Sequence, residues 1–207
     1  MMKMVIATGN GNKMREIREI FADLPLEILS MKEAGAEADP EETRTTFEEN
    51  SLIKARAVKE VLAAKGAGDT LVLADDSGLE IDALDKAPGV LSARFMGHDT
   101  SYDVKNAALL EKLEGVPEEK RTARFVCAIS CILPDGTEFV KRGTMEGKIG
   151  HEIAGENGFG YDPIFIPDGY TVSSAVISPD EKNLISHRGK ALRAMYQELS
   201  GKLKKES

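Results

Sequence analysis

Cysteine is scarce in this 207-residue sequence, which contains only Cys127 and Cys131. Both lie in one strand-like apolar run, where a spacing of four puts them on the same face and too far apart to bond each other. No histidine or cysteine partners accompany them at zinc-finger spacing. The sequence therefore argues against a disulfide framework and a zinc finger, and we expect two buried, reduced thiols.

Long apolar runs are also missing, because no stretch approaches the ~20 residues that cross a membrane. The first residues lead directly into a strand-like segment, without the apolar core of about 7–15 residues that marks a signal peptide. These absences predict a soluble, cytoplasmic protein without a membrane partner.

Positive charge is in deficit, since 27 basic residues face 35 acidic residues and the net charge is −8. Proteins that wrap a nucleic-acid polymer usually carry a basic face and a high isoelectric point, so the sequence disfavours that class. A single nucleotide is still compatible with this charge, because a few convergent lysines and a metal ion can hold one. The hydrophobic share of 42% and the charged share of 30% are ordinary for a globular protein.

Apolar periodicity and turn residues predict a mixed α/β fold. Strands are expected at residues 4–8, 26–29, 71–74, 123–133, 138–142 and 144–149, and helices at residues 12–22, 47–65 and 103–113. A final helix is expected within residues 180–199, with its firmest part beginning near Ser186. The β-α-β start predicts a parallel strand pair, and residues 134–137 predict a hairpin turn. Asn12 is expected to cap the first helix, and Thr46 with Glu49 the second.

The most informative segment is the apolar run at residues 71–74, which ends in Asp75, Asp76, Ser77 and a glycine. A strand of this composition is typically buried on both faces of a sheet, and open α/β sheets bind ligands at the carboxyl ends of their strands. Adjacent carboxylates repel each other, so a positive charge is expected nearby. A divalent metal ion with a phosphorylated substrate is the simplest candidate.

A second candidate is the turn Thr8-Gly9-Asn10-Gly11-Asn12-Lys13, which joins the first expected strand to the first helix. Glycines let backbone N–H groups approach an anion, and a helix N-terminus adds a favourable dipole. Lys13 can neutralise a phosphate. The alternative is an ordinary turn with a surface lysine, and the Gly-Lys-Ser/Thr ending of a Walker loop is absent.

Two further segments offer groups that bind a nucleotide base. In Gly158-Phe159-Gly160-Tyr161-Asp162-Pro163, Phe159 provides a stacking face, and Asp162 or backbone groups provide hydrogen bonds. Near the last helix, Lys182 is a point charge, Arg188 can bond an anion or carbonyl with two N–H groups, and His187 can donate to a keto oxygen. A structural turn and a packing histidine are the alternatives.

The remaining candidates lie near the second helix. Lys54 shares a helix face with Asn50, and this face points either to a ligand or to solvent. Glu41 and Glu42 form either a solvated acidic turn or a distant carboxylate partner for Asp76, since hard cations collect carboxylates from different segments.

Together these blocks resemble the inosine triphosphate pyrophosphatase family, which includes bacterial dITP/XTP pyrophosphatases. The matching segments are residues 8–13, 46–50 with Lys54, 74–79, 87–89, 92–94, 158–165 and 181–188. Each motif is weak alone. The set is highly specific, because the motifs occur in family order from near the N-terminus to the last helix.

The resemblance implies an α/β fold, elongated and two-lobed, with a mixed sheet and a central substrate cleft. It implies one nucleoside triphosphate pyrophosphatase domain over residues 1–207, usually as a homodimer. It also implies magnesium-dependent hydrolysis of ITP, dITP and XTP to the nucleoside monophosphate and pyrophosphate, which removes them from the nucleotide pool.

The same resemblance implies roles for individual residues. Residues 8–13 bind the triphosphate, Glu41 and Asp76 are the metal ligands, and Asp76 is also the general base. The implied substrate contacts are Lys54, Ser77, Phe159, Gly160, Tyr161, Asp162, Lys182, His187 and Arg188. A donor from His187, Arg188 or a backbone N–H would favour a keto oxygen at the six-position of the base over the amino group of adenine.

Alternation along the strand gives the two aspartates unequal roles. Successive side chains point to opposite faces, so only one of Asp75 and Asp76 is expected to face the metal directly. The resemblance selects Asp76 and leaves Asp75 as a supporting group. The alternative functions are a related pyrophosphatase for pyrimidine or other modified nucleotides, and a nucleotide-binding sensor without turnover.

Overall fold

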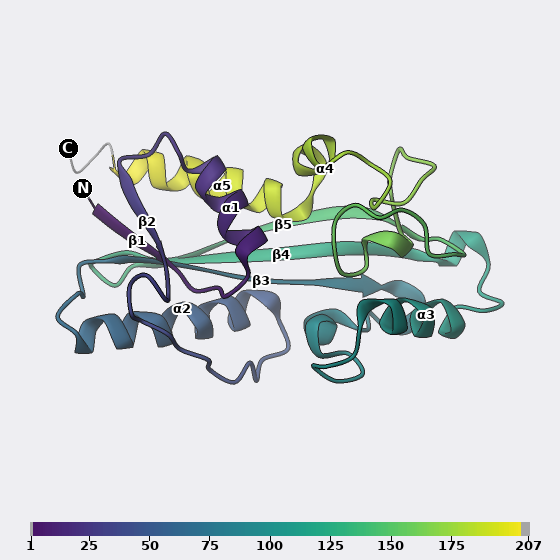
Figure 1. The fold of residues 1–207 in the computed structure, drawn as a ribbon, viewed down its shortest axis with the longest axis horizontal. Helices are drawn as coiled ribbons and strands as arrows, with labels where there is room; N and C mark the ends of the chain where they lie inside the picture. Colours follow the sequence, from purple (N-terminus) through teal and green to yellow (C-terminus); the bar gives the residue numbers. More distant parts are fainter. Residues whose placement is uncertain (1, 204–207) are drawn as a thin grey trace. The chain divides into compact units, whose positions relative to one another are not determined.

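The computed structural model describes residues 2–203 and contains one six-stranded sheet with the strand order β2-β1-β3-β4-β5-β6 (Figure 1). The strands are β1 Met2–Ile6, β2 Leu26–Ser30, β3 Leu71–Ile81, β4 Thr122–Ile132, β5 Glu138–Ile149 and β6 Phe165–Pro167. The helices are α1 Gly11–Ile20, α2 Phe47–Ala64, α3 Tyr102–Lys112, α4 Pro179–Ile185 and α5 His187–Leu203. The mixed α/β fold expected from the sequence is confirmed.

The chain divides into two compact units that are built from interleaved segments. Within the described residues, unit 1 comprises residues 2–76, 127–142 and 189–203, and unit 2 comprises residues 77–126 and 143–188. Strands β3, β4 and β5 each contribute residues to both units. Among the described residues, no helix combines the length and apolarity needed to cross a bilayer.

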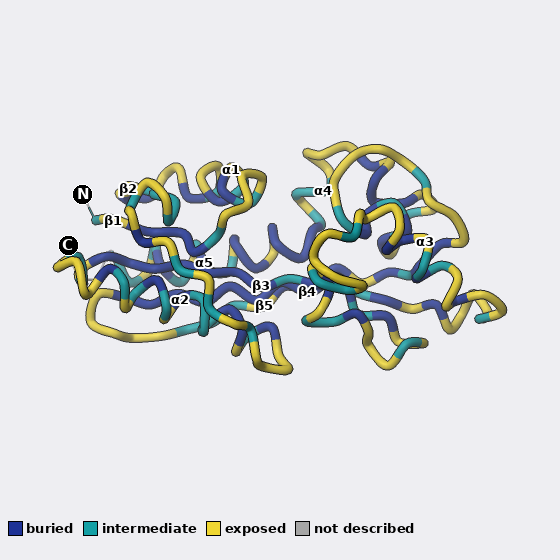
Figure 2. The backbone as a smooth tube through the Cα atoms, turned by 60° about the horizontal axis from the view of Figure 1, so that its bottom comes forward, coloured by how far each residue is buried: buried dark blue, intermediate teal, exposed yellow. Residues whose placement is uncertain are grey.

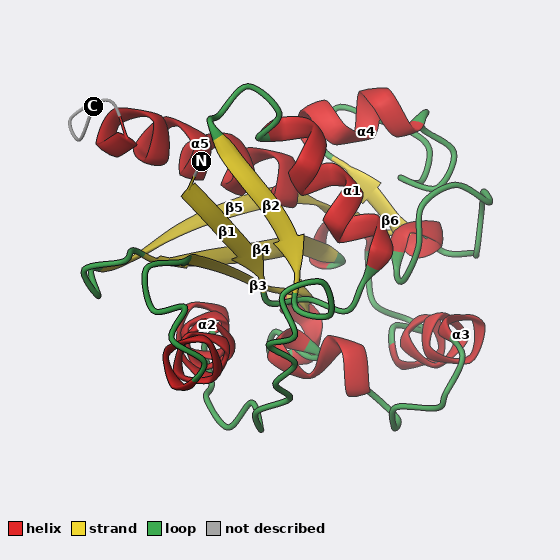
Figure 3. Cartoon of the chain, turned by 60° about the vertical axis from the view of Figure 1, so that its left-hand side comes forward, coloured by secondary structure: helices red, strands yellow, loops and turns green. Residues whose placement is uncertain are grey.

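Unit 1 contains the parallel strand pair that the β-α-β start predicts. Strand β1 lies between β2 and β3 and pairs in parallel with both (Figure 3). Met4 lies opposite Ile28 of β2 and opposite Leu71 of β3. A crossover through a helix favours parallel strands, because it returns the chain to the end of the sheet at which the first strand began.

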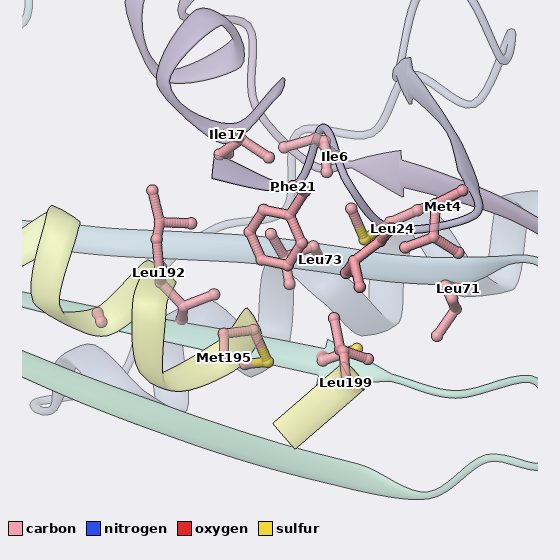
Figure 4. Close-up of a cluster of buried hydrophobic side chains, with 14 of the residues drawn as sticks. Met4, Ile6, Ile17, Phe21, Leu24, Leu71, Leu73, Leu192, Met195 and Leu199 are labelled. Atoms are coloured by element: carbon pink, nitrogen blue, oxygen red, sulfur yellow. The ribbon is translucent and has the colours of Figure 1, made fainter. Parts of the chain in front are cut away.

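Helices cover both faces of the sheet in unit 1, and β3 is buried on both sides. Its odd-numbered residues Leu71 and Leu73 pack with residues of α1 and α5 (Figure 4). Its even-numbered residues Val72 and Ala74 pack with residues of α2 in a second cluster. Cys127 and Cys131 of this unit are buried thiols, as expected from the sequence.

Unit 2 has a core of its own. Leu79 and Ile81 of β3 pack with Leu109 of α3 and with aromatic rings from β4 and β6. Strand β6 pairs antiparallel with β5. Figure 2 shows β3 and β4 as buried along most of their length, which fits strands that carry the core.

A buried arginine of unit 2 bonds to backbone carbonyls at the ends of α3 and β5. Arg121 is 2% exposed and donates its guanidinium N–H groups to the carbonyls of Leu113, Ile149 and Gly150. These bonds satisfy carbonyls where α3 and β5 end, which would otherwise be costly to bury. Desolvation lowers the pKa of Arg121 from its ordinary value.

The structure corrects four sequence-based boundaries. Strand β3 does not end at residue 74 but continues through both aspartates to Ile81. Residues 138–142 and 144–149 form one strand, since the single Gly143 between them does not force a turn. Within residues 180–199, the final helix α5 begins at His187, close to the expected Ser186, and the preceding residues form a separate helix, α4.

The fourth correction concerns the cap of α1, which is Asn10 and not Asn12. The Asn10 side-chain oxygen accepts the N–H groups of Asn12 at 2.9 Å and Lys13 at 3.2 Å. The cap of α2 is Thr46, as expected, and it accepts the N–H of Glu49 at 3.2 Å. Both caps satisfy amides that a helix start leaves without partners.

Candidate functional site

The two adjacent aspartates of β3 face opposite sides of the sheet. Asp75 forms an ion pair with Lys13 of α1 at 2.7 Å. Asp76 Oδ1 accepts a hydrogen bond from Lys54 of α2 at 3.2 Å. Because α1 and α2 pack against opposite faces of β3, the two carboxylates are separated as strand alternation predicts. Asp75 therefore pairs with Lys13, and Asp76 pairs with Lys54.

Lys54 is the centre of the charged groups on the α2 side. Its ammonium lies 3.0 Å from Glu42 Oε1 and 3.2 Å from Asp76 Oδ1. Burial opposes the charge on Lys54, but the carboxylates of Asp76, Asp75 and Glu42 outweigh that effect and raise its pKa. The lysine is thus held in its charged form and shared between two carboxylates.

Asp76 combines burial with an oxygen that is not used within the protein. The residue is 7% exposed, and its Oδ2 has no hydrogen-bond partner among the residues that the structure describes. Desolvation raises the pKa of the Asp76 carboxyl, although Lys54 acts in the opposite direction. A buried carboxylate oxygen without a donor is costly, so this atom suits a cation or a bound water.

The structure brings Glu42, and not Glu41, to this group. Glu41 is exposed, whereas Glu42 is half-buried beside Lys54. The segment is anchored by Asn50, whose amide exchanges two hydrogen bonds with the backbone of Arg44, at 3.0 and 3.1 Å. The assignment of Glu41 as a metal ligand stays a prediction. No signal in the sequence separates the two neighbouring glutamates.

The turn at residues 8–13 forms part of a small pocket in unit 1. Thr8, Gly9, Lys13, Glu42, Lys54 and Asp75 are among the residues that line it. Asn10 occupies the amides of Asn12 and Lys13, so a phosphate would reach these two amides only by displacing that side chain.

Gly9 and Gly11 leave open space beside the backbone of this turn. A Cβ atom built at either position meets no atom of the described residues within 4 Å, and neither residue has a left-handed φ. Neither packing nor backbone conformation therefore explains a glycine here. Close approach of a ligand to the backbone is a use of glycine that fits these positions.

A dedicated protein cage for a metal is not present in the part of the chain that the structure describes. No three histidine, cysteine, aspartate or glutamate side chains in residues 2–203 gather closely enough to hold an ion. The carboxylates of Asp76 and Glu42, which share Lys54, offer the oxygen ligands that suit a hard cation such as Mg²⁺. Mg²⁺ commonly takes one or two carboxylates and completes its coordination with substrate phosphates and water, and these residues fit that pattern.

In unit 2, the glycine-rich loop presents one aromatic ring. Phe159 is 41% exposed and lies between Gly158 at φ 77° and Gly160 at φ 69°. Those angles favour glycine. The Lys182 ammonium lies 5.2 Å and the Arg188 guanidinium 5.5 Å from the centre of the Phe159 ring, within cation–π range.

The next two residues of the loop point into unit 2. Tyr161 is 3% exposed, and its hydroxyl donates to the Ser92 carbonyl at 2.7 Å. Burial raises the pKa of this phenol. Asp162 is 2% exposed and accepts the Phe159 N–H at 2.8 Å. Of the four residues 159–162, Phe159 is the one with a large exposed side chain.

His187 opens α5 with a packed ring. Its imidazole is 7% exposed and stacks on Phe125 with ring centres 5.0 Å apart and an angle of 13° between the planes. Arg188 follows at 4% exposed, and Ser77 on β3 is half-buried. Lys182, His187 and Arg188 therefore lie in unit 2 with Phe159, and Lys182 and Arg188 also contact its ring.

Sequence reasoning missed the residues that hold this loop from inside. Asn106 is 1% exposed and donates to the Gly160 carbonyl at 3.1 Å. Ser174 is fully buried and donates to Asp162 Oδ1 at 2.9 Å. An amphipathic helix and a polar loop give no sign of such bonds, because their partners lie about 12 to 54 residues away in sequence.

Comparison with known proteins gives consistent matches over nearly the whole chain. The model of the Ham1 family matches residues 4–198. A dITP/XTP pyrophosphatase of Clostridium perfringens is 44% identical over 99% of this chain and 100% of its own length, and one from an Exiguobacterium species is 48% identical over 96% of this chain and 97% of its own length.

Solved structures agree with the sequence matches. A HAM1 protein from Coxiella burnetii is 37% identical with a TM-score of 0.88, and covers 97% of this chain and 100% of its own. The Staphylococcus aureus Ham1 protein is 38% identical with a TM-score of 0.86, and covers 97% of this chain and 99% of its own. These matches confirm the resemblance seen in the sequence, and they place the chain in the Ham1 family.

Proposed function

We propose that this chain hydrolyses the nonstandard purine nucleoside triphosphates ITP, dITP and XTP to the nucleoside monophosphate and pyrophosphate. The dITP/XTP pyrophosphatases among its relatives share 43–48% identity with it over almost their full length. In this proposal the charged residues Lys13, Lys54 and Asp76 of unit 1 act on the triphosphate. Phe159 of unit 2, with the donors around its ring, binds the base. Together the two units then serve as one functional domain.

The triphosphate is assigned to the turn at residues 8–13 together with Lys13 and Lys54. A nucleoside triphosphate brings about four negative charges into a protein of net charge −8, so it needs local positive charge. Both lysines line the unit 1 pocket, and they pair with Asp75 and Asp76. The open backbone at Gly9 and Gly11 supports close approach of phosphate oxygens.

Magnesium is the metal proposed for the Asp76 carboxylate. The unpartnered Oδ2 atom and the nearby Glu42 carboxylate support this choice, with Glu41 as the neighbouring alternative from the family motif. When bound, Mg²⁺ would offset part of the negative charge that develops on the phosphates.

The reaction that these residues support is attack by water on the α-phosphorus. The water oxygen forms a bond to that phosphorus, the bond from the α-phosphorus to the bridging oxygen breaks, and pyrophosphate leaves. Asp76 accepts the proton of the water, and Lys54 keeps the carboxylate oriented through its bond to Oδ1. A positioned general base of this kind is typically worth ~10²–10⁴-fold in rate.

The base is assigned to the exposed ring of Phe159 and to the donors around it. Stacking on the ring holds any purine, whereas His187, Arg188 or a loop N–H would donate to the keto oxygen at the six-position. The amino group of adenine would leave such a donor without an acceptor, which disfavours ATP. Ser77, Gly160, Tyr161, Asp162 and Lys182 complete the proposed set, in which Tyr161 and Asp162 support the loop from inside.

The observation that carries the proposal is the buried Oδ2 of Asp76, which has no partner among residues 2–203 and lies beside a lysine shared by two carboxylates. The test is release of pyrophosphate from a panel of ITP, dITP, XTP, ATP, GTP, CTP and UTP, with and without Mg²⁺. We expect Mg²⁺-dependent release from the first three. Equal efficiency with ATP, preference for pyrimidines, or binding of ITP without product would contradict the proposal.

The family resemblance also leads us to propose a homodimer that acts in the cytoplasm. Light scattering after size-exclusion chromatography would test the dimer, with twice the 22.5 kDa chain mass as the expected result. A mass of one chain would contradict it.

A further inference from the structure

Asp162 has both of its carboxylate oxygens in use inside unit 2. Oδ1 accepts the Ser174 hydroxyl at 2.9 Å. Oδ2 accepts the Phe159 N–H at 2.8 Å and pairs with the Lys182 ammonium. The carboxylate is 2% exposed, so it faces protein groups and not solvent. This arrangement is that of an internal support for the loop.

The loop backbone closes tightly over this carboxylate. A Cβ atom at Gly158 would lie 2.2 Å from Asp162 Oδ2 and 3.0 Å from Lys182 Nζ, far inside normal contact distance. Phe159 lies directly after this glycine, and its own N–H is one of the donors to Asp162. The position of the exposed ring is therefore coupled to the position of the carboxylate.

Ser174 is itself held in place by burial and by a backbone hydrogen bond. The residue is fully buried, and its backbone N–H donates to the Phe165 carbonyl at 2.7 Å, beside β6. Its hydroxyl lies 2.9 Å from Asp162 Oδ1 and 3.2 Å from the Asp162 carbonyl oxygen. A donor held in this way restricts the rotation of the carboxylate, because hydrogen bonds to an ionised acceptor are strong.

We propose that Ser174 and Asp162 are positioning residues for base recognition: the Ser174 hydroxyl fixes the Asp162 carboxylate, which fixes the Phe159 ring and the Lys182 ammonium. This inference rests on the proposed role of Phe159 in binding the base. Ser174 does not touch the nucleotide and acts only through Asp162. Without the hydroxyl, Oδ1 loses its donor, and the carboxylate is no longer restrained against rotation that loosens its contacts with Phe159 and Lys182.

The direct test is Ser174→Ala, assayed with ITP and with inorganic tripolyphosphate as a competitive inhibitor that has no base. We expect the KM for ITP to rise about tenfold, the scale of one hydrogen bond to a charged group, with kcat within about twofold. The inhibition constant of tripolyphosphate should not change. A general structural defect would move both constants.

A matched control is Ser130→Ala on β4. Ser130 is also fully buried, but its hydroxyl has no hydrogen-bond partner among the described residues. Loss of this hydroxyl should change neither constant. If Ser130→Ala raises the KM for ITP as much as Ser174→Ala does, the effect belongs to buried serines in general and the proposal is overturned.

A double-mutant cycle tests the path through Asp162. In an Asp162→Asn background, Ser174→Ala should raise the KM for ITP by less than about twofold, because the group on which the hydroxyl acts has changed. A full tenfold effect in that background would show that Ser174 acts elsewhere. If Asp162→Asn does not fold, the comparison of ITP with tripolyphosphate in the single variant decides the question.

Failure of this inference can be distinguished from failure of the proposed function. Wild-type protein that releases no pyrophosphate from any nucleotide removes the function itself. A Phe159→Leu variant with an unchanged KM for ITP removes the base-binding role of the loop. If the wild-type protein releases pyrophosphate and Phe159→Leu raises the KM for ITP, then an unchanged KM for ITP in Ser174→Ala overturns only the positioning role.

Discussion

The two units use buried aspartates in different ways. In unit 1, Asp76 keeps one oxygen without a partner among the described residues and shares Lys54 with Glu42. In unit 2, Asp162 uses both oxygens, one for Ser174 and one for the loop backbone and Lys182. A carboxylate with an unused oxygen can take part in chemistry, whereas a saturated one holds structure. In the proposed function, this difference places the chemical step in unit 1 and the choice of base in unit 2.

The largest expected effect comes from Asp76→Asn, which keeps the shape of the side chain and removes the proposed general base. We expect kcat for ITP to fall by about 10²–10⁴-fold, measured as pyrophosphate release. Circular dichroism and the unfolding midpoint should stay close to wild type, since the change removes a charge that burial disfavours.

Asp75→Asn is the matched control for that variant, because the two residues are neighbours on the same strand. Asp75 faces Lys13 on the other side of the sheet, so its loss should lower activity by about tenfold or reduce stability. Equal losses of kcat in the two variants would break the assignment of unequal roles and return the site to a carboxylate pair.

A smaller effect is expected from Phe159→Leu, which removes the ring that unit 2 exposes. Stacking of a base on an aromatic ring is worth about 1–3 kcal/mol, so the KM for ITP should rise by about tenfold or more. The value of kcat should change little, because the base lies away from the reacting phosphorus. A loss confined to kcat would contradict the division between the units.

Gly158→Ala tests by its effect on stability whether Asp162 packs under the loop of unit 2. The new methyl meets Asp162 Oδ2 at 2.2 Å, and φ is +77°, so we expect a loss of about 3 kcal/mol in the free energy of unfolding. Gly66→Ala is the control, with φ +74° and no atom of the described residues within 4 Å of the new Cβ, and should cost about 1 kcal/mol. Equal losses in denaturant unfolding would show that Asp162 does not pack under the loop.

The last prediction concerns the thiols of unit 1, whose reactivity reports whether the core of that unit opens. Burial raises the pKa of the Cys131 thiol to about 12, so at pH 8 alkylation should be about a thousandfold slower than for a free cysteine. Iodoacetamide labelling followed by mass spectrometry should find no modified thiol in the native protein and two after unfolding. Rapid native labelling of Cys131 would show that the unit 1 core opens readily.

Much of the fold follows from local sequence signals. The β-α-β start, the Thr46 cap and the hairpin at residues 134–137 each depend on neighbouring residues, and the structure confirms them. The opposite faces of Asp75 and Asp76 also follow from strand alternation alone.

The remaining features depend on contacts between distant segments. Strand β3 continues past residue 74 with its carboxylates buried beside lysines from two helices, and no local pattern shows that pairing. The choice of Glu42 beside Lys54 depends on how Asn50 anchors the preceding loop. The inward direction of Asp162 depends on Ser174, 12 residues later in the chain.

The division of roles between the units is tested most directly by calorimetric titration of ITP into Asp76→Asn, with Mg²⁺ present and turnover suppressed. The account predicts that this variant still binds ITP, and that adding Phe159→Leu weakens the affinity by about tenfold. Equal affinity of the single and double variants, or no binding of ITP to Asp76→Asn, would contradict it.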